Sequence, residues 1–514
     1  MNQSQKMKTT HSKTIGLRAY QMKAADLIGA GFNDFTKQLL VAATGAGKTQ
    51  IFCETVRRHQ PRKSLVLCHR EELIGQAAAR LESFGIPVEI EMGGSVASLN
   101  ASAVVGSVQT LMGDSRLARW PSHHFGLVVA DEAHRAMSDS WQKVLRHFDG
   151  SANVLGVSAT PERSDKRHLG KYFQSIPYEI GLLDLVQQGW LAPIKVKTVP
   201  LGMNLDSVRT TAGDFNADDL GHALEPYLER IADVLVQHRH RKTLVFLPLV
   251  AVSKRFAEIC RERGLKAEHV DGQTNERRAV LDRFRRDETR ILTNAMLLTE
   301  GYDEPSIDCV VCLRPTKVRA LYSQIIGRGT RICPGKDHLL VLDFLWQSSE
   351  HSLVKPAHLI AEDEEDARAL TEKLGDEGDM EEARAEVNAD RTRKLTERLM
   401  ENRRRKGAVL DPLELAVTLN DAHLAEFIPV MQWQGESPTS KQLDCLGRFG
   451  MDVNAILTKG HASFLLDRLI TRRKLELATP KQVRLLRKYD HPRPEMATFK
   501  DAQAFLAIKF GSAA

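Results

Sequence analysis

The fold is decided by the stretch LLVAATGAGKT, which runs from Leu39 to Thr49. Its apolar first half predicts a buried β-strand, and the residues after it, from Gln50 to His59, predict a helix. Glycines at the turn let the backbone bend tightly and direct its N–H groups inward, because they lack a Cβ atom. A strand, a glycine-rich turn, a Lys-Thr pair and a helix together predict a phosphate-binding loop.

The chemistry of this loop assigns roles to its last two residues. Lys48 supplies a full positive charge for β- and γ-phosphates, and Thr49 supplies a hydroxyl ligand for Mg²⁺. The N-terminus of the helix adds the positive end of its dipole. The strict pattern G-x-x-x-x-G-K-[ST] requires glycine where this chain has Ala42, and Gly-Lys-Thr alone is a weak signal, so the assignment depends on motifs farther along the chain. The predicted loop positions are Thr44, Gly45, Ala46, Gly47, Lys48 and Thr49.

Length and composition are those of a globular, multidomain chain. Its 514 residues predict about three domains, and a 42% hydrophobic fraction is enough for sizeable cores. No apolar run approaches the roughly 20 residues that a membrane span needs. The seven cysteines are scattered and odd in number, which favours a reducing compartment over a disulfide framework. Cys309 and Cys312, the one close pair, lie in a strand pattern and are interpreted as core thiols rather than zinc ligands.

Charge is distributed unevenly along the chain. The net charge is +6, but residues 361–390 hold 13 acidic against 3 basic side chains, a local charge of −10. The rest of the chain therefore carries +16, which indicates a polyanionic partner such as a nucleic acid. A merely solvated basic surface is the alternative.

Short apolar strands alternate with helical segments from about residue 15 to residue 195, which predicts a doubly wound parallel sheet. One of these strands, Leu127–Ala130, leads directly into Asp131-Glu132-Ala133-His134. Two adjacent carboxylates at a strand end can take different roles: Asp131 can hold a hydrated Mg²⁺, and Glu132 can polarise an attacking water. Without the phosphate-binding loop, surface acids at a strand end would be the favoured interpretation.

A second alternation of strands and helices begins near residue 243 and has no phosphate-binding loop of its own. Its strands are expected at 243–247, 267–270, 290–293, 307–313 and 338–344. Near its end, Arg328 and Arg331 are expected at positions i and i+3 on one helix face. Permanently charged, planar guanidinium groups suit a γ-phosphate whose charge redistributes during transfer.

The series TGAGKT, LCHREEL, GSVQTL, DEAH, SATP, VDGQT, TEGYDEP and QIIGRGTR resembles, in order and spacing, motifs I to VI of superfamily 2 helicases and translocases. The resemblance covers roughly residues 15–348 and implies an α/β fold of two RecA-like parallel-sheet lobes with ATP in the cleft between them. HREEL, TEGYDEP and QIIGRGTR look closer to the DNA-directed branch, which includes RadD-like DNA repair helicases and restriction-enzyme motor subunits, than to DEAD-box or DEAH-type RNA helicases. The likeness to RadD is weaker beyond the motor, since this chain has no zinc-type cysteine cluster there.

The resemblance implies a nucleic-acid-dependent ATPase that uses ATP and Mg²⁺, a DNA helicase or remodeller. The cysteine usage and the N-terminal stretch favour the cytoplasm of a bacterial-type cell, with nucleoid association when the protein is bound to DNA. Glu132, Arg328 and Arg331 would be catalytic, and Thr49 and Asp131 would hold the metal. Further nucleotide contacts are expected at Arg18, Gln21, Asp303 and Gln324. Nucleic-acid contacts are expected at Arg70, Thr110, Gly272 and Thr293, and couplers between the two sites at His134, Ser158 and Thr160. Two alternatives stay open: an RNA-directed helicase, and an ATP-switched clamp or recruiting module that does not unwind.

The C-terminal region carries a repeat with a period of 40 residues. Thr439, Lys441, Gln442, Leu446, Thr458, Ala462 and Leu466 recur as Thr479, Lys481, Gln482, Leu486, Thr498, Ala502 and Leu506. Each copy predicts a helix opened by Thr-x-Lys-Gln, a loop and a second, Thr-capped helix. Contact with nucleic acid and packing against the rest of the chain are both open for this module.

The expected domain organisation combines these patterns. We expect a disordered N-terminus at 1–14, a first lobe at 15–195, a linker at 196–228, a second lobe at 229–350, a charged helical linker at 351–434 and the helical repeat at 435–514.

Overall fold

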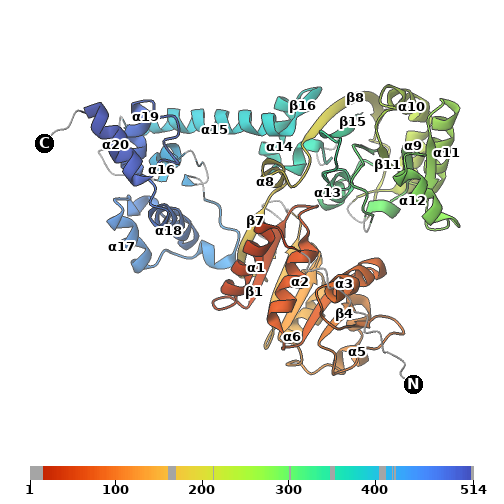
Figure 1. Cartoon of the computed structure of the whole chain (residues 1–514), viewed down its shortest axis with the longest axis horizontal. Coiled ribbons are helices and arrows are strands. Elements are labelled where there is room, and N and C mark those ends of the chain that lie inside the picture. Colours follow the sequence, from red (N-terminus) through yellow and green to blue (C-terminus); the bar gives the residue numbers. More distant parts are fainter. Residues whose placement is uncertain are drawn as a thin grey trace, which may run out of the picture. The chain divides into compact units, whose positions relative to one another are not determined.

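The computed structural model of the chain describes residues 16–159, 169–211, 214–299, 302–347, 353–403, 412–419, 421, 424–425 and 427–510. The chain divides into two compact units, the first made of Met1–Pro161 and Ser175–Ile360 and the second of Glu162–Gln174 and Ala361–Ala514. The predicted fold class is confirmed, because the first unit contains two parallel sheets covered by helices and the second contains mainly helices (Figure 1). Among the described residues, no helix combines the length and apolar character that crossing a membrane requires.

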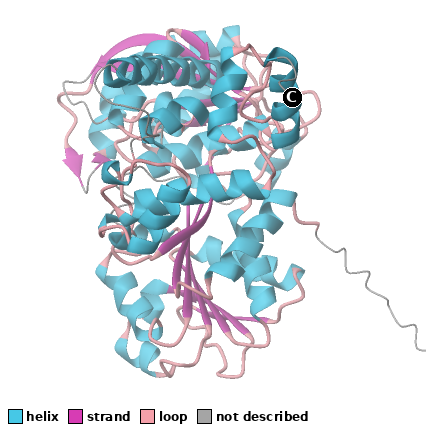
Figure 2. Cartoon of the chain, turned by 90° about the vertical axis from the view of Figure 1, so that its left-hand side faces the viewer, coloured by secondary structure: helices cyan, strands magenta, loops and turns pink. Residues whose placement is uncertain are grey.

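The first lobe is built on a parallel sheet with the strand order β3-β4-β2-β5-β6-β1-β7. Helices lie on either side of its strands (Figure 2), so both faces are covered and β1 is buried from Gln38 to Ala42. The strands are β1 (Lys37–Ala42), β2 (Ser64–Cys68), β3 (Val88–Glu91), β4 (Ala103–Ser107), β5 (Leu127–Asp131), β6 (Asn153–Ser158) and β7 (Ser175–Ile180). The helices are α1 (Ala19–Gly31), α2 (Lys48–His59), α3 (Glu71–Ser83), α4 (Val108–Leu111), α5 (Asp114–Ala118), η1 (Ala133–Arg135), α6 (Asp139–Phe148) and α8 (Leu182–Gln187). Because every pairing is parallel, the carboxyl ends of the strands share one edge, where ligands of such sheets bind.

The second lobe contains a parallel sheet in which the strands β12-β13-β11-β14-β15-β8 lie next to one another in that order. They are β8 (Ile194–Asn204), β11 (Thr243–Phe246), β12 (Ala267–Val270), β13 (Ile291–Asn294), β14 (Cys309–Cys312) and β15 (Leu339–Gln347). The accompanying helices are α10 (Leu228–Gln237), α11 (Val250–Glu262), α12 (Arg277–Arg285), α13 (Arg319–Gly327), η3 (Leu297–Thr299) and η4 (Pro356–Leu359). Cys309 and Cys312 are both buried, and burial raises the pKa of each thiol to about 12.

Residues 196–228, expected as a linker, contain regular structure that belongs to the second lobe. β8 pairs in parallel with β15, and the chain continues through the short hairpin strands β9 (Thr210–Thr211) and β10 (Asp214–Phe215), then α9 (Ala217–Leu224) and η2 (Glu225–Tyr227). The reason is apolar burial: Met203, Phe215 and Leu220 pack in the same core as Phe256 and Phe344.

The second unit contains the acidic tract and the repeat. Its elements are α14 (Glu364–Leu374), β16 (Glu377–Asp379), α15 (Met380–Arg403), α16 (Pro412–Leu419), η6 (Gln432–Gly435), α17 (Ser440–Arg448), η7 (Val453–Ala455), α18 (Lys459–Lys474), α19 (Pro480–Lys488) and α20 (Phe499–Phe510). The acidic tract is part of folded structure, since the buried Asp366 carboxylate pairs with Arg384 and Arg391, each at 2.7 Å.

The two copies of the repeat use the same helix start. In α17 and α19, the hydroxyls of Thr439 and Thr479 accept the N–H of Gln442 and Gln482 at 3.3 Å, and each glutamine side chain accepts the threonine N–H at 2.9 Å. These are reciprocal capping boxes, which the Thr-x-Lys-Gln pattern predicts. Each copy has its own small apolar core, and Leu419 of α16 packs against both.

Candidate functional site

The phosphate-binding loop lies where β1 ends and α2 begins. Gly47 is the N-cap of α2 with φ 75°, and Gly45 has φ 92°, both in the left-handed region that favours glycine. A Cβ atom on Gly47 would lie 2.5 Å from Nε2 of Gln21, so the loop is also closely packed. The backbone N–H groups that open α2 remain directed toward the space in front of the loop.

A cavity of about 740 Å³ lies in front of this loop and is lined by residues of both lobes. It brings together nearly all of the predicted nucleotide residues: Arg18, Gln21, Thr44, Gly45, Gly47, Lys48, Thr49, Asp131, Glu132, Asp303, Gln324, Arg328 and Arg331. Ala46 is the exception. It is fully buried, and its carbonyl accepts hydrogen bonds from the Tyr20 hydroxyl at 2.6 Å and from Gln21 Nε2 at 2.9 Å.

Glu132 holds an unusual backbone conformation directly after β5. Its φ and ψ are 55° and 53°, a left-handed conformation that costs a non-glycine residue about 1–3 kcal/mol and is concentrated at functional sites. Its carboxylate lies 3.3 Å from Nδ1 of His134. Burial acts to raise the pKa of Glu132, but the nearby Lys48 ammonium and His134 lower it more, so the net shift is downward. An ionised carboxylate therefore faces the phosphate-binding lysine.

The second lobe contributes to the cavity from α13 and from the loop after it. Nε2 of Gln324 lies 3.4 Å from Oε1 of Glu132, which joins the two lobes across the cavity. Nη1 of Arg328 donates to the carbonyl of Tyr302 at 2.8 Å, and Nη1 of Arg331 lies 2.5 Å from Oδ2 of Asp303.

The prediction that both arginines lie on one helix face is wrong. Helix α13 ends at Gly327, so Arg328 is its C-cap and Arg331 lies in the following loop. Glycines at the helix end and just after it allow the backbone to approach its neighbours closely. A Cβ atom on Gly327 would lie 2.3 Å from Cγ2 of Thr44, and one on Gly329 would lie 2.4 Å from Cδ1 of Leu339. The same close approach sets the arginine loop against the phosphate-binding loop.

One aromatic residue that lines the cavity, Trp190, was missed from the sequence, as was the buried Tyr20 beside it. Trp190 lines the cavity, its ring lies 4.8 Å from the guanidinium carbon of Arg18, and its centroid lies 5.8 Å from that of Tyr20. The Trp190 ring offers a face on which a base can stack. No motif marks Trp190, which lies over 140 residues beyond the phosphate-binding loop. The only sequence signal for an aromatic group near this site was Tyr20, one residue before Gln21.

Gln21 uses both ends of its side chain within the protein. Its Oε1 accepts the N–H of Arg18 at 3.0 Å, and its Nε2 donates to the carbonyl of Ala46. Gln21 therefore ties the start of α1 to the phosphate-binding loop, and its contact with adenine stays a prediction.

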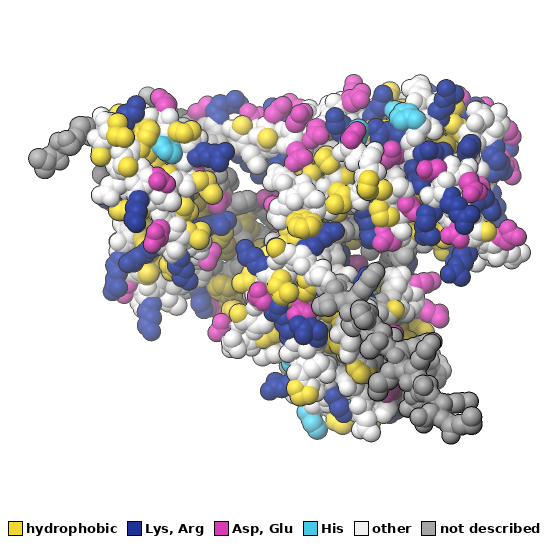
Figure 3. All heavy atoms as spheres, in the orientation of Figure 1, with side chains coloured by type: hydrophobic (Ala, Val, Ile, Leu, Met, Phe, Trp, Pro, Cys, Tyr) yellow, Lys and Arg dark blue, Asp and Glu magenta, His cyan; other side chains and the backbone are white. Residues whose placement is uncertain are grey.

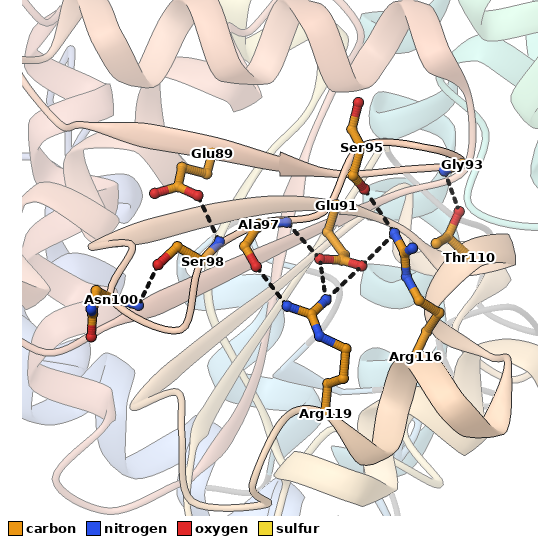
Figure 4. Close-up of polar contacts among 10 residues, drawn as sticks. All are labelled: Glu89, Glu91, Gly93, Ser95, Ala97, Ser98, Asn100, Thr110, Arg116 and Arg119. Carbon is orange, nitrogen blue, oxygen red and sulfur yellow. Dashed lines mark hydrogen bonds and ion pairs between the residues drawn. The ribbon is translucent and has the colours of Figure 1, made fainter.

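In the first lobe, the predicted nucleic-acid residues come after the carboxyl ends of neighbouring strands. Arg70 is the N-cap of α3 after β2, and Thr110 lies in α4 after β4. The Thr110 hydroxyl accepts the N–H of Gly93 at 3.0 Å, which joins it to the loop after β3 (Figure 4).

That loop is held by the buried carboxylate of Glu91, which faces two arginines in Figure 4. Glu91 accepts the N–H of Ala97 at 2.8 Å, and its oxygens lie 2.6 Å from Nη2 of Arg116 and 3.2 Å from Nη1 of Arg119. The same arginines donate to the carbonyls of Ser95 and Ala97 at 2.7 and 2.8 Å. The surface around Thr110 is therefore fixed by a charged cluster beneath it.

In the second lobe, only one of the two predicted nucleic-acid positions is accessible. Gly272 is exposed after β12. Thr293 is a correction: it has no exposed surface, and its hydroxyl donates to the carbonyl of Ser253 at 3.0 Å. β13 pairs with β12 and β11 at its two edges, and α11 packs against it, so Thr293 has no surface that a ligand could contact.

Two of the three predicted couplers, His134 and Ser158, lie close to strand ends of the first lobe. Ser158 is buried at the end of β6, and His134 lies in η1 beside Glu132. Thr160 lies outside the described residues.

Positive charge gathers on the second lobe. Figure 3 shows Lys and Arg side chains, with acidic ones among them, over α11 and α12. On and next to α12, Arg277, Arg278, Arg285 and Arg286 are exposed.

Two family models match the chain. Residues 14–163 match the model described as "Type III restriction enzyme, res subunit", and residues 226–333 match the helicase conserved C-terminal domain. The two matched regions correspond to the two lobes.

Among similar proteins, IRC3 of Saccharomyces cerevisiae, provisionally named an ATP-dependent helicase, is 34% identical over 359 residues, which cover 65% of this chain and 52% of that protein. The endonuclease subunit of the type I restriction enzyme EcoAI of Escherichia coli is 27% identical over 374 residues, covering 64% and 46%. The chain thus spans about half the length of these curated relatives. A solved fragment provisionally identified as the HsdR subunit of a type I restriction enzyme from Vibrio vulnificus YJ016 has the same fold, with a TM-score of 0.51, 23% identity and 64% coverage of both chains.

Proposed function

Because the chain belongs to superfamily 2 of the helicases and translocases, we propose that it couples ATP hydrolysis to movement along DNA, as a helicase or remodeller. One observation carries the proposal: Lys48, Thr49 and Glu132 of the first lobe and Arg328 and Arg331 of the second line one cavity. A site split between two lobes lets the state of the nucleotide control the relative position of the lobes.

The proposed hydrolysis assigns each group a role. The phosphate-binding loop and Lys48 hold the β- and γ-phosphates, and Trp190 with Arg18 offers a stacking face for the base. Glu132 orients and polarises the attacking water, since a carboxylate with a lowered pKa stays ionised at neutral pH. Arg328 and Arg331 stabilise the charge that develops on the transferred phosphoryl group.

The oxygen ligands at the site fit Mg²⁺. Thr49 offers a hydroxyl and Asp131 a carboxylate, both line the cavity, and hard oxygen donors are the ligands that this ion prefers. When bound, Mg²⁺ would neutralise charge on the β- and γ-phosphates. Asp131 also accepts the N–H of Glu132 at 3.1 Å, so the same residue helps to set the backbone of the catalytic base.

The preference for DNA rests on relatives and charge. The matched res-subunit model and the EcoAI subunit both belong to restriction enzymes by name, and the exposed arginines at α12 suit a phosphate backbone. The seven cysteines are free thiols, five of them buried, which supports a proposed location in a reducing cytoplasm, with the nucleoid as its site when bound to DNA.

We further propose that the repeat of the second unit contacts the DNA backbone. Lys441 and Lys481 occupy matching exposed positions, as do Arg448 and Lys488. None of these four cations forms an ion pair with an acidic residue that the structure describes. Nζ of Lys488 lies 5.5 Å from the ring centre of Tyr489, which puts a cation beside an aromatic face.

The test is ATPase activity measured with single-stranded, duplex and forked DNA and with RNA, beside strand-displacement and translocation assays. We expect DNA to raise kcat and RNA to have little effect, and Glu132→Gln to abolish the signal. Equal or greater stimulation by RNA would replace the DNA proposal with the RNA-directed one. ATP-dependent DNA retention without translocation would favour a clamp.

A further inference from the structure

The ammonium group of Lys336 lies among backbone carbonyls close to the arginine loop. Its Nζ lies 2.5 Å from the carbonyl oxygens of Ile307 and Gly329 and 2.7 Å from that of Arg331. A fourth carbonyl, from Pro305, lies at 3.3 Å. A lysine ammonium has three N–H donors, so the three short contacts use all of them.

These carbonyls belong to two different loops. Pro305 and Ile307 come after Asp303 and lead into β14, whereas Gly329 and Arg331 belong to the loop that carries the two proposed catalytic arginines. The ion pair between Arg331 and Asp303 joins the same two loops at their side chains. Lys336 therefore fixes the backbones of two loops whose side chains face the cavity.

We propose that Lys336 is a positioning residue for ATP hydrolysis, which holds the Arg328–Arg331 loop against the Asp303–Ile307 loop without touching the nucleotide. Lys336 itself does not line the cavity. The inference rests on the proposed function, because it assumes that Arg328 and Arg331 act on the phosphates.

The geometry requires a lysine in particular. Three carbonyl oxygens converge on one nitrogen, which suits a compact ammonium with donors at tetrahedral angles. An arginine keeps the charge, but its planar, wider group cannot direct three donors to the same point. A methionine of similar length fills the space and donates nothing, which leaves carbonyl dipoles facing one another.

The buried position of Lys336 gives it a pKa different from that of an exposed lysine. Burial lowers the pKa of Lys336 to about 8, against the opposing influence of Asp308 and Cys333. The Asp308 carboxylate itself accepts the N–H of Lys242 at 2.7 Å and lies 3.8 Å from Nη1 of Arg241. Above that pH the ammonium loses a proton and with it one of its three hydrogen bonds to the loops.

Loss of positioning at high pH can be separated from unfolding. Between the lowered folded-state pKa and the ordinary value of 10.5, the unfolded chain binds more protons at this lysine than the folded chain. This group alone therefore makes the free energy of unfolding rise with pH over that interval. Between these two pKa values, turnover is expected to fall as the pH rises, whereas the contribution of Lys336 to the free energy of unfolding is not expected to fall.

The experiment compares Lys336→Met and Lys336→Arg in the full-length chain, with Lys266→Met as a matched control. Lys266 is exposed just before β12, at the far edge of the second sheet from β15. For Lys336→Met we expect kcat of the DNA-stimulated ATPase to fall by about 10- to 100-fold, the scale of a misplaced catalytic group, with ATP Kd changed less than about threefold. The control should keep both values.

The pH profile provides the second readout. Wild-type kcat should fall above about pH 8, and Lys336→Arg, though slower, should lack that alkaline decrease because its charge persists. Wild-type turnover by Lys336→Met, or identical alkaline profiles for wild type and Lys336→Arg, would overturn the inference. If Lys336→Met does not fold, the comparison of the pH profiles of wild type and Lys336→Arg alone tests the inference. A wild-type chain without DNA-stimulated hydrolysis would instead overturn the proposed function.

Discussion

The two lobes hold their proposed catalytic residues in different ways. In the first lobe, the phosphate-binding loop and Asp131-Glu132 directly continue buried strands of the sheet, and α2 starts from the loop itself. In the second lobe, Asp303, Arg328 and Arg331 lie on loops outside regular structure, joined by an ion pair and by the carbonyl contacts of Lys336.

This difference indicates which proposed catalytic residues can shift without unfolding of their lobe. Positions fixed by a sheet core can be lost only with the fold, because strands and their hydrogen bonds form cooperatively. Positions fixed by one ammonium group and one ion pair can shift while the lobe stays folded. Substitutions near the site should therefore displace the proposed catalytic residues of the second lobe more readily than those of the first.

The largest expected effect comes from removing the second lobe's arginines. Arg328→Ala and Arg331→Ala should each lower kcat by about 10³-fold, the lower range for an arginine that stabilises the transition state, and change ATP Kd far less. Single-turnover hydrolysis and equilibrium ATP binding measure the two quantities. Arg209→Ala, which removes a surface arginine paired with Asp219, is the control. Normal hydrolysis by both variants in the presence of DNA would remove the second lobe from the chemistry.

The first lobe's counterpart is Glu132→Gln, which should lower hydrolysis by about 10²-fold or more and leave ATP binding intact. The amide keeps the size of the side chain but cannot accept a proton from water. The variant should still fold cooperatively, because the sheet fixes the position of this residue. Glu82→Gln, an exposed acid at the end of α3, controls for charge. Near-normal turnover in Glu132→Gln would refute the assignment of the base.

The contact between the lobes can be broken and restored. Gly327→Ala places a methyl group against Cγ2 of Thr44 and should push the arginine loop away, with kcat about tenfold lower. Thr44→Ser removes that Cγ2 atom but leaves the Cβ atom of residue 44 at 2.8 Å, so the double variant should recover part of the loss. Steady-state kcat for the four combinations measures the coupling. Without recovery in the double variant, the effect of Gly327→Ala arises elsewhere.

The smallest effect on turnover is expected outside the two lobes. Replacing Lys441, Arg448, Lys481 and Lys488 with glutamine should leave kcat at saturating DNA unchanged and raise the Kd for duplex DNA about tenfold. The slope of log Kd against log salt should flatten by about 3 to 4, for four lost phosphate contacts. Fluorescence anisotropy across salt concentrations gives both values. Replacing the ion-paired Arg209, Arg255, Arg263 and Lys373 with glutamine controls for the loss of four charges. An unchanged slope would leave the repeat as a packing or partner-docking module.

The sequence predicted what local pattern controls. The strand, glycine turn and helix around Lys48 arise from apolar runs and backbone freedom, and the capping boxes of α17 and α19 arise from Thr-x-Lys-Gln. These features need only residues that are near one another in the chain.

The errors and omissions all depend on contacts between distant residues. Thr293 was expected at an exposed strand end, but which residue first leaves a strand depends on its neighbours, here β12 and β11. The close approach of Gly327 to Thr44, some 280 positions earlier, was likewise not visible in the sequence. Trp190 and Lys336 carry no motif, since a single residue acquires its role only where the fold brings its partners.

Leu419, which packs against both copies of the repeat, determines how large a segment must be to fold as an independent module. Although the sequence repeats every 40 residues, Leu419 packs against both small cores, and α16 is tied to α19 by Arg484 with Glu414 at 2.8 Å. If a single copy were grafted onto another protein, Leu419 would lose its packing against the core of the other copy. The smallest block expected to keep both cores intact is therefore residues 412–510, about 100 residues, although one copy of the repeat spans only 40.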